Sequence, residues 1–225
     1  MTEPGATQSL TAVAQDYLKV IWSAQEWTDQ PVTTKALAAR LGVGTSTVSE
    51  TVRRLADAGL VSHEPYGAVG LTALGRTHAL QMVRRHRLLE TFLVAQLGYG
   101  WDQVHDEAEV LEHAVSDAFV ERVATLLGNP ARDPHGDPIP GPDGVLRVPP
   151  ARTARQREPG TWRVARISDA DPGLLRHLAS VGLALDACVD VSRQEVTGVV
   201  TVTLPDGAQV DLGEVAASAI WLTAP

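Results

Sequence analysis

Cysteine is almost absent from this chain: Cys188 is the only one, so no internal disulfide can form. It lies in the alternating segment LDACVDV, which predicts a buried strand residue. No apolar run approaches the roughly 18 residues that a membrane span needs. The N-terminal residues MTEPGATQSL also lack the basic and apolar regions of a signal peptide. We therefore expect a globular, cytoplasmic protein with no membrane partner.

Excess positive charge is also missing, since the formal net charge is −8. This balance argues against wholesale electrostatic attraction to nucleic acid. The acid is concentrated in residues 79–127, which carry 4 Lys and Arg against 8 Asp and Glu. Bound divalent cations would offset that excess. A length of 225 residues with 44% apolar content fits two or three small domains.

The first 75 residues have the pattern of a winged helix-turn-helix. Apolar residues recur at helical spacing from Ser9 to Trp27, and Thr33 or Thr34 can cap the short helix KALAARL. Gly42-Val43-Gly44 breaks that helix, and Thr45 or Ser46 can cap the next one, TVSETVRRLADAG. The segment LVSHEPYGAVGLTALG then predicts two short strands around a turn.

The polar face of the second helix of this motif is suited to DNA. Small hydroxyl residues at a helix N-terminus allow close approach, phosphate contacts and methyl contacts to thymine, and arginines reach phosphates. A glutamate can accept from the cytosine amino group. The alternative is a plain helical hairpin with a solvated face. The predicted DNA-contacting residues are Thr45, Ser46, Thr47, Ser49, Glu50, Arg53 and Arg54.

Residues 105–113, HDEAEVLEH, are typical of a metal site on a helix. Glu109, Glu112 and His113 share one face, and His105 lies one turn before Glu109. A second pair, His86 and Glu90, is again four residues apart. Imidazole and carboxylate without thiolate suit manganese, iron(II), zinc, cobalt or nickel. The plain alternative is the solvated face of an amphipathic helix.

The rest of the chain divides into helices, a linker and strands. A long helix over Thr72–Leu97 has more apolar surface than one bundle seam needs, so we expect part of it to face another subunit. Residues 129–160 are rich in Pro and Gly and predict irregular structure, in which a loop histidine such as His135 is most often exposed. From Trp162 onward, alternating segments predict a small β-barrel of about five strands.

The segments DYLKVIW, TVSETVRRL, HRLLE, VHDEAEVLEH and GDPIPG, in this order, resemble the diphtheria toxin repressor family of metal-dependent transcription regulators. The resemblance covers essentially the whole chain. It implies a mainly α protein with small β parts, divided into a winged helix-turn-helix DNA-binding domain (1–75), a helical dimerisation and metal-binding domain (76–145), a linker (146–160) and an SH3-like barrel (161–225).

The resemblance also implies ligands. One site would use Asp16, Glu109, Glu112 and His113, and a second would use His86 with Glu90 and His105. The iron-responsive branch has methionine and cysteine where this chain has Asp16 and Glu109, so the resemblance favours Mn²⁺, with Fe²⁺ as the alternative. The motif DPHGDP is similar to that of streptococcal manganese regulators. It suggests Asp133 and His135 as ligands, completed by Asp169 or Asp171.

These implications predict a manganese-activated, homodimeric repressor of metal-uptake genes that binds palindromic double-stranded DNA operators, rather than an iron(II) regulator of the same family. A metalloenzyme is a weaker alternative, because no nucleophile or general-base motif accompanies the ligands and no small-molecule substrate is expected. A metal-independent DNA-binding protein with a protein-interaction barrel is a third hypothesis.

Overall fold

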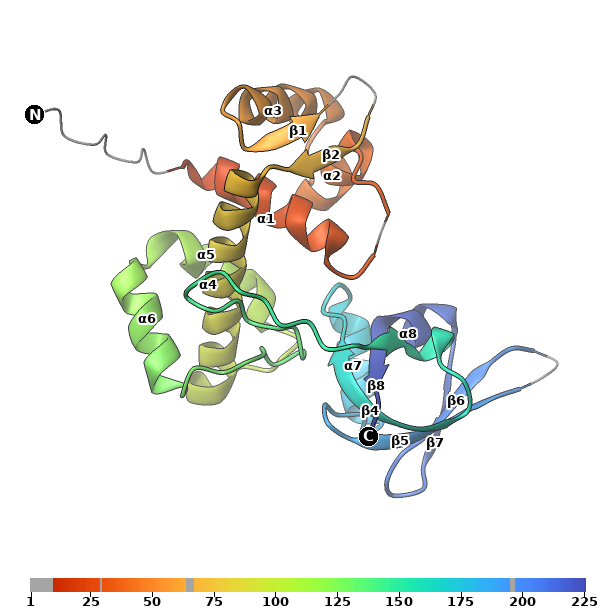
Figure 1. Ribbon diagram of the computed structural model, residues 1–225. Coiled ribbons are helices and arrows are strands. Elements are labelled where there is room, and N and C mark those ends of the chain that lie inside the picture. The colour runs from red at the N-terminus through yellow and green to blue at the C-terminus, as the bar shows by residue number, and fades with distance from the viewer. Residues whose placement is uncertain (1–9, 29, 64–66, 195–196) are drawn as a thin grey trace, which may run out of the picture. The chain divides into compact units, whose positions relative to one another are not determined.

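The computed structural model describes residues 10–28, 30–63, 67–194 and 197–225 (Figure 1). The chain forms two compact units. The first runs to Arg85 and includes residues 140–145, whereas the second contains residues 86–139 and 146–225. Within the described residues, no helix is both long enough and apolar enough to cross a membrane.

The first unit is a winged helix-turn-helix, as predicted. It contains helices α1 (Ala12–Glu26), α2 (Thr34–Leu41) and α3 (Thr45–Asp57), and the antiparallel wing strands β1 (Val61–His63) and β2 (Val69–Leu71). Its core is formed by fully buried aliphatic side chains from all three helices, with Leu18, Ile21, Leu37, Val48 and Val52 at 0% exposure. The tip of the predicted wing turn, residues 64–66, and Ser9 lie outside the described residues.

The start of α3 differs from the sequence prediction. Thr33 caps α2 by accepting from the Ala36 backbone N–H, as expected, but the N-cap of α3 is Gly44 and has no side-chain cap. Thr45 and Ser46 are already inside the helix, so the prediction that one of them caps it is wrong. The physical reason is that Gly44 itself takes the extended backbone of an N-cap, a position that glycine tolerates well.

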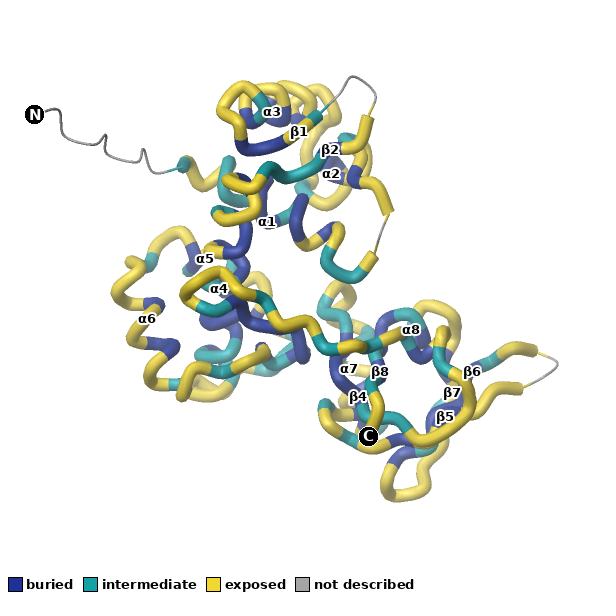
Figure 2. The backbone as a smooth tube through the Cα atoms, in the orientation of Figure 1, coloured by how far each residue is buried: buried dark blue, intermediate teal, exposed yellow. Residues whose placement is uncertain are grey.

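The helical part of the second unit begins halfway along α4 (Ala73–Leu97) and continues with α5 (Val104–Ala114) and α6 (Asp117–Leu126). Leu88 of α4 packs in a cluster with Val120 and Val123 of α6. The next residue, Leu89, packs with Val104 and Ala108 of α5. Two faces of α4 are therefore buried in separate clusters, and the buried turns of this half of the helix are dark blue in Figure 2. The expectation that α4 also faces another subunit stays a prediction.

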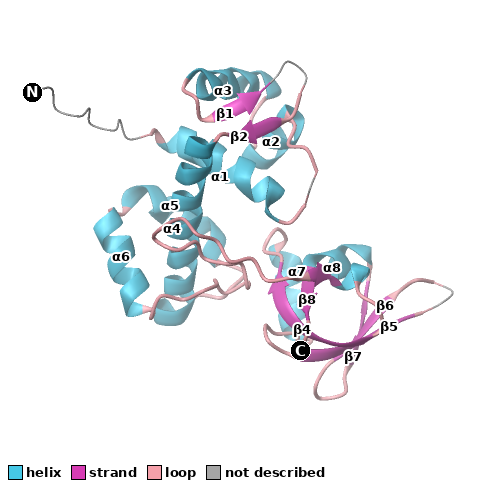
Figure 3. Ribbon diagram, viewed as in Figure 1, coloured by secondary structure: helices cyan, strands magenta, loops and turns pink. Residues whose placement is uncertain are grey.

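The C-terminal part is a six-stranded antiparallel sheet with order β3-β8-β4-β5-β6-β7, which curves around its own core (Figure 3). Its core includes Val164, Ile167, Leu178, Ile220 and Leu222, each fully buried. The elements are β3 (Arg152–Thr153), the 3₁₀ turn η1 (Ala154–Gln156), β4 (Gly160–Ile167), α7 (Pro172–Ser180), β5 (Cys188–Arg193), β6 (Val200–Thr203), β7 (Gln209–Leu212), α8 (Glu214–Ala219) and β8 (Ile220–Thr223).

Two predictions about this part are corrected, and two helices were missed. The segment 146–160 is not entirely an irregular linker, because Arg152 and Thr153 pair with β8 and Ala154 is fully buried in the sheet core. Cys188 begins a strand but is exposed. The reason is the phase of the alternation: Val189 and Val191 point inward, so their neighbours point outward. Helices α7 and α8 were not predicted.

Candidate metal centre and nucleic-acid interface

Helix α3 presents one polar face to solvent. All seven predicted DNA-contacting residues are exposed, whereas Val48, Val52 and Leu55 on the opposite face are buried in the first unit. The Ser49 hydroxyl of this face donates to the Thr45 carbonyl, and the exposed Arg54 guanidinium donates at 3.3 Å to the hydroxyl of Thr51, which is buried. The exposed first turn of α3 therefore has the small polar side chains with which a recognition helix meets base edges.

The candidate metal ligands of the second unit come from α4 and α5. His86 and Glu90 are buried on α4, while α5 carries His105, Glu109, Glu112 and His113. Glu112 is 1% exposed, so it is not part of a solvated helix face. Asp16, predicted to join Glu109, Glu112 and His113, lies half-buried on α1 of the first unit, and its participation stays a prediction.

His86 connects the two helices through both of its ring nitrogens. Nδ1 lies 2.6 Å from Glu112 Oε2, and Nε2 lies 3.0 Å from Glu90 Oε1. An ionised carboxylate only accepts, so the hydrogen bond to Glu112 places a proton on Nδ1. Nε2 also faces a carboxylate, so a protonated ring can donate to both glutamates, whereas a ring that binds an ion through Nε2 keeps only the proton on Nδ1. A histidine whose second nitrogen is held by a carboxylate is a common arrangement around protein-bound metals.

The loop DPHGDP holds His135 in the interior, which corrects the expectation of an exposed loop histidine: His135 is 0% exposed. Asp133 Oδ1 accepts from the backbone N–H groups of His135 (2.8 Å) and Asp137 (2.9 Å), and thereby fixes the turn. Asp133 Oδ2 lies 3.6 Å from Arg87 Nε. Asp133 therefore shapes the loop, and it is absent from the clusters of potential ligands found among the described residues.

One nitrogen of His135 is an unsatisfied buried acceptor. His135 Nε2 lies 2.7 Å from the Trp101 carbonyl oxygen, which can only accept, so Nε2 carries the proton. Nδ1 then has a lone pair and no hydrogen-bond partner among the described residues. It lies 4.0 Å from each of two carboxylate oxygens, Glu90 Oε2 and Asp133 Oδ1. A lone pair facing carboxylates in the interior is costly unless a cation lies between them.

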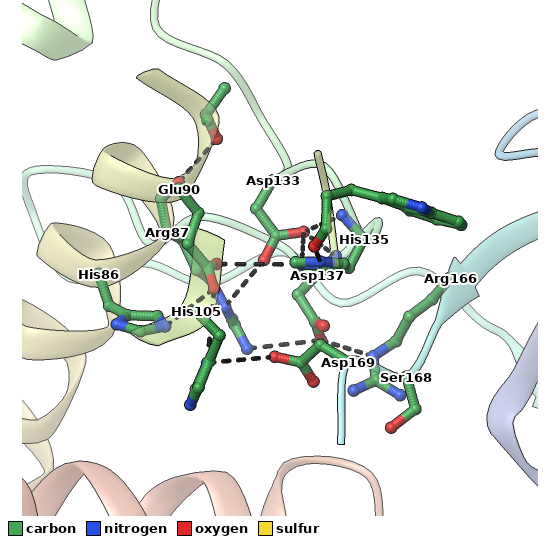
Figure 4. A network of polar contacts seen from close by, with 12 residues as sticks. His86, Arg87, Glu90, His105, Asp133, His135, Asp137, Arg166, Ser168 and Asp169 are labelled. Carbon is green, nitrogen blue, oxygen red and sulfur yellow. Dashed lines mark hydrogen bonds and ion pairs between the residues drawn. The ribbon is translucent and has the colours of Figure 1, made fainter. Parts of the chain in front are cut away.

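The loop after β4 brings a carboxylate from the C-terminal sheet to this site. Asp169 Oδ2 lies 3.7 Å from His105 Nδ1, and Figure 4 shows Asp169 directed toward His105. The sequence left Asp169 and Asp171 as alternatives. Asp171 instead caps α7 by accepting from the backbone N–H groups of Gly173 and Leu174, so its carboxylate is already used.

Two groups of potential ligand atoms result within the second unit, each with all atoms within 4.8 Å of one another. One comprises His86, His105 and Glu109, and the other comprises Glu90, His135 and Asp169. Ligands about 2.1 Å from one ion lie about 3.0 Å apart when adjacent in an octahedron and about 4.2 Å apart when opposite. Each group therefore needs only small side-chain shifts to bind an ion.

The charges at the site are strongly coupled. Burial alone would raise the pKa of Glu90, but the His86 charge and hydrogen bonds from His105 and His86 lower it well below its usual value. The hydrogen bond to Glu90 raises the pKa of His105. Burial and the nearby Asp137 and Glu90 carboxylates raise the pKa of Asp133 well above its usual range. Crowded carboxylates that depend on nearby positive charge are suited to a divalent cation.

The donor chemistry fits a hard or borderline metal. Both groups offer imidazole nitrogen and carboxylate oxygen only, with no sulfur donor among their described members, and Cys188 lies on β5 of the sheet. Sequence reasoning missed the buried ion network beside the site, formed by Arg87, Asp133, Asp137 and Arg166. It also missed Trp101. For Asp137, the only signal in the sequence was its position as the second aspartate of DPHGDP.

Comparisons with protein families cover almost the whole chain. The sequence profile of the iron dependent repressor N-terminal DNA-binding domain matches residues 9–69. The iron dependent repressor metal-binding and dimerisation domain matches residues 72–141. The FeoA domain matches residues 156–224.

Individual relatives agree with these matches. The diphtheria toxin repressor of Corynebacterium efficiens is 30% identical over 227 residues, covering 95% of this chain and 96% of the relative. The iron-dependent repressor IdeR of Mycobacterium leprae is 36% identical over 132 residues, covering 59% of this chain and 57% of the relative.

A solved structure described as a manganese-dependent transcriptional repressor in complex with manganese is 59% identical, with a TM-score of 0.90. The match covers 94% of this chain and 100% of that one. With the winged helix, the imidazole and carboxylate groups and the C-terminal sheet, these similarities show that the chain belongs to the diphtheria toxin repressor family of metal-dependent transcriptional repressors, which are not enzymes.

Proposed function

We propose that this chain is a manganese-activated, homodimeric repressor that binds palindromic operators of metal-uptake genes. The observation that carries the proposal is the ligand chemistry. Buried nitrogen and oxygen donors converge at the second unit, and the His135 Nδ1 lone pair faces the Glu90 carboxylate without a hydrogen bond from the described residues. Manganese is a hard ion, and a given set of ligands generally binds it more weakly than the later divalent metals. Replacing sulfur donors by oxygen donors therefore raises the relative affinity of the site for Mn²⁺ over softer ions.

Two further observations favour manganese over iron(II). The 59% identical structure is described as manganese-dependent and in complex with manganese. The family resemblance places Asp16 and Glu109 where the iron-responsive branch has methionine and cysteine. With oxygen donors at these two positions, every proposed ligand of that site is a hard oxygen donor except the imidazole of His113. Iron(II) remains the competing ion to test, because IdeR is described as iron-dependent.

The exposed polar face of α3 supports double-stranded DNA as the partner, and the proposal therefore places the protein in the cytoplasm. In a homodimer, two copies of α3 would occupy major-groove half-sites about one helical turn apart, which explains a palindromic operator. We propose residues 1–75 for DNA binding, 76–145 for dimerisation and metal binding, 146–160 as the connection and 161–225 as the SH3-like domain. Within the connection, β3 belongs to the sheet.

The proposed mechanism is a shift in population. The bound ion supplies positive charge that compensates the crowded carboxylates. In its absence, repulsion between acidic side chains leaves the DNA-binding domains in many orientations, few of which match the half-site spacing. By the family resemblance, Asp16 contributes a carboxylate from α1 to the set carried by α5. A tenfold change in occupancy of the DNA-binding arrangement needs about 1.4 kcal/mol of differential metal affinity.

Fluorescence anisotropy of labelled operator DNA tests the proposal directly. The operator is selected from a random duplex pool with manganese-loaded protein, and chelator-stripped protein is then titrated at fixed salt with Mn²⁺, Fe²⁺ or Zn²⁺ separately. We expect Mn²⁺ to strengthen binding at concentrations where Fe²⁺ has little effect. Equal or better activation by Fe²⁺ would show an iron(II) regulator, and binding that no metal changes would refute metal control.

The contribution of Asp16 is tested by Asp16→Ala in the same assay. We expect loss of most metal-dependent DNA binding with dimerisation intact by sedimentation, because the ligand from the DNA-binding domain is removed. Asp106→Ala is the control, since Asp106 is an exposed carboxylate of α5 outside the ligand groups. Unchanged operator affinity in Asp16→Ala defeats the mechanism, even if the protein still binds metal.

A further inference from the structure

The loop that carries His135 lies directly against the end of β4. The Ile167 backbone N–H donates to the His135 carbonyl at 2.9 Å, and Gly136 has a φ of +93°. A Cβ at Gly136 would lie 2.2 Å from the Ala165 carbonyl oxygen and 2.9 Å from Arg166 Cα. Only glycine allows this approach. Asp169 follows Ile167 by two residues, so the same contact that holds the loop also places this carboxylate.

A buried ion pair fastens the same two segments. Arg166 Nε donates to Asp137 Oδ1 at 2.6 Å, and both residues are less than 10% exposed. Arg87 Nη2 of α4 lies 3.4 Å from the same oxygen, and the Arg166 guanidinium lies 4.2 Å above the Trp221 ring of β8. Figure 4 shows this chain of contacts running from α4 through the loop to β4.

Trp101 provides a second connection. Its ring packs against the hydrophobic core of the C-terminal sheet and stacks on the His135 imidazole, with centroids 6.1 Å apart and planes inclined by 15°. Its carbonyl oxygen accepts from His135 Nε2. One residue therefore contacts the sheet core and sets which nitrogen of His135 keeps the lone pair.

We propose that Trp101, Gly136, Asp137 and Arg166 form a docking clamp, which holds the C-terminal sheet so that Asp169 and His135 are presented to one metal ion. This inference rests on the proposed function, because it assumes that Glu90, His135 and Asp169 bind the ion. The four residues are positioning residues and do not themselves contact the metal. In this arrangement the C-terminal domain acts on the metal centre through how firmly it is docked.

The energetics of buried ion pairs support a positioning role. Burying a carboxylate and a guanidinium costs desolvation that their attraction offsets only in part, so such a pair adds little net stability compared with apolar side chains of similar volume. What the pair does provide is a defined geometry. Residues that orient metal ligands typically change metal affinity by about 10- to 100-fold when they are replaced.

The test counts bound Mn²⁺ by electron paramagnetic resonance, in which the signal of free hydrated Mn²⁺ falls as the ion binds to the full-length chain. Arg166→Met should weaken one class of Mn²⁺ sites by about tenfold or more and leave the others unchanged. Arg157→Met is the matched control, because Arg157 also lies over a tryptophan of the sheet, Trp162 at 4.1 Å, but its guanidinium donates to the backbone carbonyls of Leu222 and Pro150 and not to the loop that carries His135. Equal affinity in Arg166→Met and wild type overturns the proposal.

A glycine pair covers the case in which Arg166→Met does not fold. Gly136→Ala should weaken the same class of sites, because its Cβ forces the loop away from β4. Gly128→Ala carries a similar backbone strain at a φ of +75°, with nothing within 4 Å of the added Cβ. It should therefore keep wild-type Mn²⁺ affinity. Equal Mn²⁺ affinity in the two glycine variants contradicts the clamp.

A double-mutant cycle separates positioning from general damage to the fold. If Arg166 acts by presenting Asp169, Arg166→Met should add little to the loss caused by Asp169→Ala. Full additivity overturns the proposal. His135→Ala separates a failure of the proposed metal site from a failure of the clamp. If this variant still binds every Mn²⁺ equivalent, both the metal site and the clamp are refuted. If it loses one equivalent while Arg166→Met keeps wild-type Mn²⁺ affinity, the clamp alone is refuted.

Discussion

The two ends of the candidate metal centre in the second unit differ in burial. The side chains of Glu90 and His135 are each 1% exposed, whereas those of His105 and Glu109 are 49% and 39% exposed. At the buried end, water cannot replace a missing ligand, and the His135 lone pair has no alternative partner among the described residues. At the exposed end, water can take a vacated coordination position. Burial therefore indicates which ligands decide whether an ion binds and which adjust how tightly it binds.

The largest effect is expected from His135→Ala. Removing the buried nitrogen should weaken Mn²⁺ binding at this site by about 100-fold, equivalent to about 2.7 kcal/mol, because no water can substitute for it in a closed interior. Isothermal titration calorimetry against chelator-stripped protein measures the affinity. A loss no greater than that of His105→Ala would break the distinction between the two ends.

Bound metal should also stabilise the fold, and most of this stabilisation should depend on the ligands at the buried end. At a free Mn²⁺ concentration 100 times Kd, binding to the native state adds about 2.7 kcal/mol to the free energy of unfolding. For a chain of this size that raises Tm by roughly 5–10 °C. Scanning calorimetry with and without chelator tests this. His105→Ala should retain most of the increase and His135→Ala should lose it, so an equal increase in both variants would contradict the comparison.

At the exposed end, His105→Ala should weaken Mn²⁺ binding by only about tenfold, or about 1.4 kcal/mol. The side chain is half exposed, and water can occupy the position it leaves. The same titration that measures His135→Ala provides the value. Glu109→Ala is a matched variant, since Glu109 is comparably exposed. A complete loss of Mn²⁺ binding in either variant would show that the exposure of a ligand does not predict its contribution to affinity.

The smallest effect is expected at an exposed ion pair. Arg132 donates to Asp186 in a two-pronged contact and lowers the pKa of Asp186. A carboxyl group with a lowered pKa stabilises the fold above its unfolded pKa of about 3.9, and this contribution is lost as pH falls through the native value. Both side chains are roughly half exposed, so solvent screening limits the effect to under about 1 kcal/mol.

Asp186→Asn tests this contribution without disturbing the backbone, because asparagine also tolerates the φ of +64° found there. Urea unfolding at pH 7 should show a small loss of stability, and this loss should shrink progressively as the pH falls below about 3.9. A loss as large as that of Asp137→Asn, which alters a buried pair, would remove the distinction between buried and exposed charges.

Local periodicity predicted the helices and strands that form the cores. The helix-turn-helix, the wing, the long α4, the α5 ligand helix and five strands all follow from spacing within the sequence. The candidate ligands His86, Glu90, His105 and Glu112 could be proposed because they repeat along helix faces. These features depend on neighbours within a few residues, which a sequence displays directly.

Two of the failures concern contacts between distant residues. His135 is buried because Trp101 and the end of β4 cover its loop, and nothing within DPHGDP itself indicates this. Residues 152–153 form a strand only because β8 is available to pair with them. Two errors had local signals: the Asp171-Pro172 pair marks the start of α7, and the polar Asp190 shows that the face it shares with Cys188 points outward.

The Gly136 contact with β4 has a consequence for how this architecture could be recombined. The loop carries the proposed ligand His135, and its backbone conformation matches the surface of one particular strand end. A C-terminal sheet transplanted from a relative without residues 131–139 would meet an unmatched loop. The loop and the sheet should therefore be exchanged together. This holds although helices α5 and α6 separate the loop in the sequence from α4, which carries the first candidate ligands.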